Sequence, residues 1–162
     1  MGILFNINDY KKRKTLEKQI ISDFQKIAEY ILKERLAKIK KVNIKILKDF
    51  PSAKGYDLAF DNLYNNGEIN FIITPSYDTN REGRMNVLAH ELVHIKDMID
   101  KRLKFNLKNK VYIWKGKRYT KVYSYAKFDE FETREEQVNY ISKICPWEKE
   151  ACLVSDNINQ LV

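Results

Sequence analysis

Apolar residues recur at steps of three to five positions between residues 10 and 40, with lysines and glutamates between them. This spacing is close to the turn of an α-helix, so it predicts a long helix with one apolar face over residues 10–40. The apolar positions are Leu16, Ile20, Phe24, Ile27, Ile31 and Leu36.

The stretch after this helix has the pattern of strands. Residues 42–46 alternate between apolar and polar side chains, as in a strand with one buried face. Apolar-rich runs at 56–64 and 68–74 flank the sequence Asn-Asn-Gly at 65–67. Because Asn and Gly tolerate the positive φ of a tight turn, these runs predict a β-hairpin, which Pro75 ends.

The second half of the chain contains patterns of both kinds. A mostly apolar segment predicts a helix over about 81–100, and a second hairpin is predicted from strands at 111–114 and 117–123 that turn at Lys115-Gly116. A short helix should begin near Thr133, which is followed by Glu136 in a capping-box pattern.

A last helix is predicted over about 146–161, because Pro146 suits the first turn of a helix. The order of a helix, three strands, a helix, a hairpin and two helices predicts an α+β fold with a small mixed or antiparallel sheet. The sequence contains no internal repeat and no Pro/Gly/Ser-rich linker, so residues 1–162 are expected to form one domain.

The chain carries a net charge of +8, and much of it comes from one segment. Residues 101–121 contain nine Lys or Arg and no acid, with Phe105, Tyr112, Trp114 and Tyr119 between them. We interpret this segment as a solvated hairpin. A groove for nucleic acid or an acidic polypeptide is the alternative, and such binding would be weak.

The same sequence bears on location and redox state. It has no run of 18 apolar residues that could cross a membrane and no secretory signal at its start, so we expect a cytoplasmic protein without a membrane partner. Cys145 and Cys152 are interpreted as reduced core thiols, with metal ligation as a minor alternative. No particular oligomeric state is predicted.

The two histidines of the chain, His90 and His94, are both found in the pentapeptide His-Glu-Leu-Val-His at 90–94. On a helix, residues four apart project from the same face, so both imidazoles can bind one metal ion. Glu91 lies beside the first histidine, where it can act as general base on a water activated by that ion. The simpler interpretation is a half-buried helix whose histidines are satisfied by hydrogen bonds.

This pentapeptide, together with Glu-Lys-Glu-Ala at 148–151, resembles the gluzincin type of HExxH zinc peptidases. The chain is most similar to small single-domain members from phages and mobile elements. The resemblance implies that a helix and a small sheet precede the HExxH helix. It also implies that the third zinc ligand is a glutamate on a later helix, here Glu148. Cys152 stands where the family has an acid or an amide.

Alternatives for the third ligand stay open at this point, namely Glu150, Asp100 or an acid within 129–136. Asp97 or Asp78 would support the histidines by hydrogen bonding. Tyr119, Tyr123, Tyr125 and Tyr140 are the candidates for stabilising the oxyanion.

The sequence therefore predicts a zinc-dependent metallopeptidase that hydrolyses peptide bonds of a protein substrate, which could be one dedicated protein. The proposed ligands of Zn²⁺ are His90, His94 and Glu148, and Glu91 is the catalytic residue. The alternative is a zinc-binding module without proteolysis that binds nucleic acid or protein through residues 101–121. An intact Glu91 argues against that alternative, since a structural zinc site needs no general base.

Overall fold

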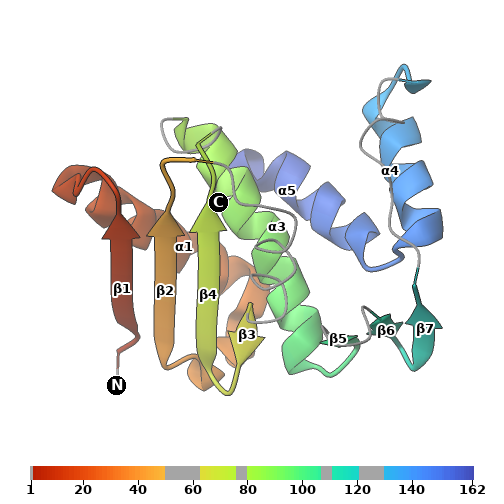
Figure 1. Cartoon of the computed structure of the whole chain (residues 1–162), viewed down its shortest axis with the longest axis horizontal. Coiled ribbons are helices and arrows are strands. Elements are labelled where there is room, and N and C mark those ends of the chain that lie inside the picture. The colour runs from red at the N-terminus through yellow and green to blue at the C-terminus, as the bar shows by residue number, and fades with distance from the viewer. Residues whose placement is uncertain (1, 50–62, 76–79, 107–110, 121–129) are drawn as a thin grey trace.

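The computed structural model describes residues 2–49, 63–75, 80–106, 111–120 and 130–162, and every structural statement below refers to these residues. They form an α+β fold with two separate sheets, which confirms the predicted fold class (Figure 1). The N-terminal helix, the HExxH helix, the basic hairpin and the two C-terminal helices are all present.

The first sheet has the strand order β1-β2-β4-β3. Strands β1, β2 and β4 run parallel, and the short β3 is antiparallel to β4. Strand β1 was not predicted, because its six residues look like a short apolar start until β2 is placed beside them. The bounds are β1 (Leu4–Asp9), β2 (Lys41–Ile46), β3 (Tyr64–Asn65) and β4 (Glu68–Ile73).

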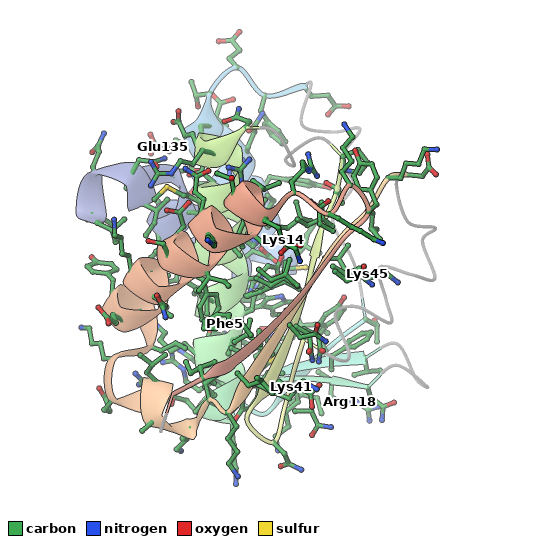
Figure 2. The ribbon with its side chains drawn as sticks, turned by 90° about the vertical axis from the view of Figure 1, so that its left-hand side faces the viewer. Phe5, Lys14, Lys41, Lys45, Arg118 and Glu135 are labelled. Carbon is green, nitrogen blue, oxygen red and sulfur yellow. The ribbon has the colours of Figure 1, made fainter. Side chains whose placement is uncertain are left out.

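One face of this sheet is apolar and is covered by helix α1 (Lys14–Leu32). Phe5 of β1 and Phe71 of β4 both contact Phe24 of this helix, with ring centroids 5.5 and 5.9 Å apart. Figure 2 shows Phe5 on the side of α1 and Lys45 on the opposite side of the sheet. The alternation in the strands therefore separates the core from the polar face, as the pleat of a strand requires.

The N-terminal helix is shorter than the predicted range of 10–40. It begins only at Lys14, because the Asp9 carboxylate accepts hydrogen bonds from the backbone N–H groups of Lys11 and Arg13 at 3.0 and 2.9 Å and holds them in a turn. At its other end, Lys33 has a φ of 52° and the chain continues as a 3₁₀ helix, η1 (Lys33–Lys38). The helix is thus confirmed with different ends.

The predicted turn between β3 and β4 is confirmed. Asn66 and Gly67 have φ values of 47° and 85°, which is the pair of left-handed residues that a two-residue hairpin needs. The carbonyl of Gly67 also accepts a hydrogen bond from Lys40 N at 2.8 Å, so the turn is tied to the start of β2. Most of the predicted strand 56–64 lies outside the described residues.

The second sheet consists of β5 (Leu103–Asn106), β6 (Val111–Trp114) and β7 (Lys117–Tyr119), all antiparallel. The hairpin between β6 and β7 was predicted, and Lys115 and Gly116 form its turn with φ values of 49° and 84°. Strand β5 was not predicted, since Leu-Lys-Phe-Asn is too short to show a pattern. The end of the predicted strand 117–123 lies outside the described residues.

Two helices follow this sheet, α4 (Arg134–Ile144) and α5 (Glu148–Leu161). Thr133 caps α4 as predicted, because its hydroxyl accepts a hydrogen bond from Glu136 N at 3.2 Å. The Glu136 carboxylate accepts from Glu132 N instead of Thr133 N, so the capping box is shifted by one residue. Among the described residues, no helix is long and apolar enough to cross a membrane.

The two hairpin glycines provide a matched test of the first turn. A Cβ on Gly67 would lie 2.7 Å from the Lys38 carbonyl oxygen, whereas a Cβ on Gly116 meets no atom within 4 Å. Both have the same left-handed backbone, so Gly116→Ala should lower the free energy of unfolding by about 1 kcal/mol. Gly67→Ala should cost about 1–3 kcal/mol more because of the added clash. Urea denaturation measures both, and equal losses would contradict this account of the turn.

Candidate metal centre

The HExxH pentapeptide lies in helix α3 (Arg81–Ile99). Asn80 caps its first turn, since the side-chain oxygen accepts a hydrogen bond from Gly83 N at 3.2 Å. Leu88, Leu92 and Ile95 are buried in the core between this helix, α1 and the first sheet. A helix held in this way presents its histidines in a fixed direction.

Helix α5 packs along α3 in the antiparallel direction. Near one end, Asn159 Nδ2 lies 3.3 Å from Asn86 Oδ1, and near the other Lys96 forms an ion pair with Glu150. The first turn of α5 therefore lies opposite the middle of α3, which brings Glu148 to the two histidines.

The three predicted ligands come together at this contact. The Glu148 carboxylate lies between the imidazoles, with Oε2 at 2.8 Å from His90 Nε2 and Oε1 at 3.2 Å from His94 Nε2. The imidazole rings are nearly perpendicular, with centroids 4.8 Å apart. Ligands of a tetrahedral zinc ion are separated by about 3.4 Å, so each contact with Glu148 is close to what such an ion requires. The donor atoms of His90, His94 and Glu148 do not all lie within 4.8 Å of one another, so the two histidines would have to move closer together to share one ion. Metal binding itself stays a prediction.

Burial differs sharply around the cluster. The His94 side chain is 2% exposed and that of Glu148 is 10% exposed, whereas His90 is 25% exposed. One side of the cluster therefore faces the core and the other faces solvent. Glu91, next to His90, is half-buried on the same helix.

The electrostatics of the cluster favour a charged pair. Burial alone would raise the pKa of Glu148, but the charge of His94 and hydrogen bonds from both histidines outweigh it and hold this pKa below its usual range. Burial likewise lowers the pKa of His90, yet hydrogen bonds with Cys152 and Glu148 raise it well above its ordinary value. A metal ion would take the place of the imidazole proton in balancing the carboxylate.

Cys152 belongs to the same cluster, one turn after Glu148. Donor atoms of His90, Glu148 and Cys152 all lie within 4.8 Å of one another. His94 does not belong to this group, because its donor atoms do not lie within 4.8 Å of all the others, and it contacts the group through Glu148. Both cysteines are buried and neither forms a disulfide, in agreement with the predicted reduced core thiols. The spacing of four between residues 148 and 152 was the signal that could have placed this sulfur at the site.

The other candidates for the third ligand have different partners. Glu150 pairs with Lys96, and Asp100 Oδ1 accepts from Arg35 Nε at 2.7 Å. Within 129–136, Glu130, Glu132, Glu135 and Glu136 are exposed and lie outside the donor cluster, and Asp129 lies outside the described residues. Glu148 is therefore the predicted carboxylate that reaches the two histidines.

The predicted supporting residues lie elsewhere or are not described. Asp97 is fully buried, and its Oδ1 accepts from Arg102 at 2.6 Å, an ion pair that fixes the turn after α3. Burial raises the pKa of Asp97 despite this arginine. Asp78 is outside the described residues. Hydrogen bonding to His90 comes instead from Cys152, which the sequence analysis did not assign.

The tyrosines proposed for the oxyanion are engaged in ring packing where the structure describes them. Tyr119 meets Trp147 edge-on with centroids 5.5 Å apart, and Tyr140 packs on Phe131 at 5.2 Å. Tyr123 and Tyr125 lie outside the described residues. The stabilising group therefore stays unassigned.

The aromatic side chains of the basic segment are largely engaged within the protein. Tyr112 stacks on Trp147 with ring centroids 4.9 Å apart. Arg102 and Lys115 lie over Trp114, at 5.7 and 5.2 Å from its ring centroid. Rings that are packed internally offer little surface for stacking bases, which favours the interpretation as a solvated hairpin.

Comparisons with known proteins do not identify the chain. No family model matches the sequence, and neither a curated protein nor a solved structure is significantly similar to it. A functional assignment therefore depends on the geometry of the cluster.

The cluster predicts about one zinc ion per chain in protein purified without added metal. Glu148→Gln and His94→Ala should each lose most of the zinc, because either change removes one of three donors. Glu150→Gln is the matched control, since it changes an exposed carboxylate two residues away and should retain the metal. Elemental analysis measures the content. Wild-type protein that stays metal-free in zinc-containing buffer would contradict the metal centre.

Proposed function

We propose that this protein is a zinc-dependent metallopeptidase of the gluzincin type. The observation that carries the proposal is the convergence of two imidazole Nε2 atoms on one buried carboxylate, from two helices far apart in the sequence. Two imidazoles and one carboxylate are the donor set of many catalytic zinc sites. Three such donors leave one position of a tetrahedral ion for water or substrate.

The residues have separate roles in this proposal. His90, His94 and Glu148 hold the ion, which supplies Lewis acidity for the scissile carbonyl and for the attacking water. Glu91 follows the first ligand on the half-buried side of α3, and its charge acts on His90. It accepts the proton of the attacking water and delivers it to the leaving amine.

The burial pattern supports access by a substrate. His90 is partly exposed while His94 is enclosed, so a peptide would approach from the side of His90 and Glu91. The proposed substrate is a protein or peptide.

Glu91→Gln tests the proposed chemistry. The amide keeps the size of the side chain but cannot accept the proton, so proteolysis should fall by about 10²–10⁴-fold while zinc content and fold are retained. Glu82→Gln changes an exposed carboxylate in the first turn of the same helix and should leave activity unchanged.

New protein N-termini in cells that express each variant provide the readout when the substrate is unidentified. Circular dichroism and elemental analysis check the fold and the zinc. If wild type and Glu91→Gln produce the same cleavage products, the protein is a zinc-binding module without proteolysis and the proposal is wrong.

A further inference from the structure

The buried thiol of Cys152 belongs to the smaller core and also lies at the donor cluster, where the three-ligand site gives it no role. Its side chain is on the face of α5 that meets the histidines, one helical turn from Glu148, and the residue is 2% exposed. Its sulfur lies within 4.8 Å of the donor atoms of His90 and Glu148.

The geometry is that of two helical pairs facing each other. His90 and His94 are four apart on α3, and Glu148 and Cys152 are four apart on α5. Because the helices are antiparallel and each pair occupies one face, the two pairs face each other. His90, Glu148 and Cys152 form the close group, and His94 contacts it through Glu148. A zinc–sulfur bond is about 2.3 Å long, so sulfur and nitrogen on the same ion lie about 3.6 Å apart. Binding of the ion would therefore have to draw the donor atoms closer than the 4.8 Å within which they lie.

Charge favours the same arrangement. A dication held by two neutral imidazoles and one carboxylate leaves one net positive charge on a largely buried donor set, and a thiolate cancels it. Arg134 of α4 donates from Nε to Asp156 Oδ2 at 2.9 Å, and this hydrogen bond, with a smaller interaction with Cys152, raises the pKa of Arg134. Thiolate is also a donor that zinc binds well.

We propose that Cys152 is a fourth protein ligand of the metal site, which closes the resting site as His90, His94, Glu148 and Cys152. The thiol releases its proton to solvent when it binds the ion. The position that hydrolysis requires is then occupied, so the thiolate must leave before a substrate can be cleaved. This inference rests on the proposed function, because it requires that the site bind zinc.

Cobalt substitution gives a direct readout of the sulfur. The tests use the full chain as wild type, Cys152→Ser and Cys145→Ser, each loaded with Co²⁺. Cys145 is the matched control, since it is also buried and in no disulfide but lies outside the donor cluster. Wild type and Cys145→Ser should show thiolate-to-cobalt charge-transfer absorption in the near ultraviolet. Cys152→Ser should lose this absorption while it keeps the visible bands of bound cobalt.

The outcomes separate this inference from the function on which it rests. Visible cobalt bands without charge transfer in the wild type would overturn the inference and leave the three-ligand peptidase site standing; Cys152 would then only orient His90. Charge transfer that persists in Cys152→Ser would also overturn it. A folded wild type that binds no cobalt would reject both.

A second measurement avoids the variants altogether, in case Cys152→Ser does not fold. X-ray absorption of the zinc-loaded wild type should show one sulfur at about 2.3 Å in the zinc shell. A shell of nitrogen and oxygen alone would overturn the inference.

Discussion

The burial of one carboxylate between two helices is the interaction on which the rest of the site depends. Glu148 is removed from water at the first turn of α5, where an ionised side chain is costly without partners. His90 and His94 provide those partners from α3, so the two helices can pack closely only in the register that joins them. The same contact that satisfies the carboxylate also creates the donor cluster.

Two hydrophobic cores hold helices α3 and α5 in place. Helix α3 is part of the large core formed with α1 and the first sheet, and its last turn reaches a smaller core around Trp147. Met98 contacts both cores, and Cys152 belongs to the smaller one. Figure 1 shows α3 between the first sheet and α5, with the second sheet beyond its C-terminal end. The candidate site thus lies where the two cores meet, which limits the movement of its ligands.

The chemistry of the site depends on how many protein donors an ion would have. With three donors, the half-exposed side of His90 leaves room for water and for a peptide, which is the requirement of hydrolysis. With Cys152 added, the same residues form a closed site of the kind that stabilises a fold. Since His90 lies close to both Glu148 and Cys152, the position of one sulfur would decide between these two arrangements.

Local patterns in the sequence determined the α+β class, the HExxH helix with its histidine pair, and the turns at Asn66-Gly67 and Lys115-Gly116. These features could be predicted because helix periodicity and positive φ depend on neighbouring residues. Strands β1 and β5 were not predicted from the sequence. Each is short and is recognised only from the strand that it pairs with, β2 and β6 respectively. The choice of Glu148 over Glu150 or Asp100, and the position of Cys152 beside His90, were decided only by the packing of α5 on α3. These contacts join residues more than fifty positions apart in the sequence. They depend on which faces of the two helices pack together, and a local sequence pattern does not determine that packing.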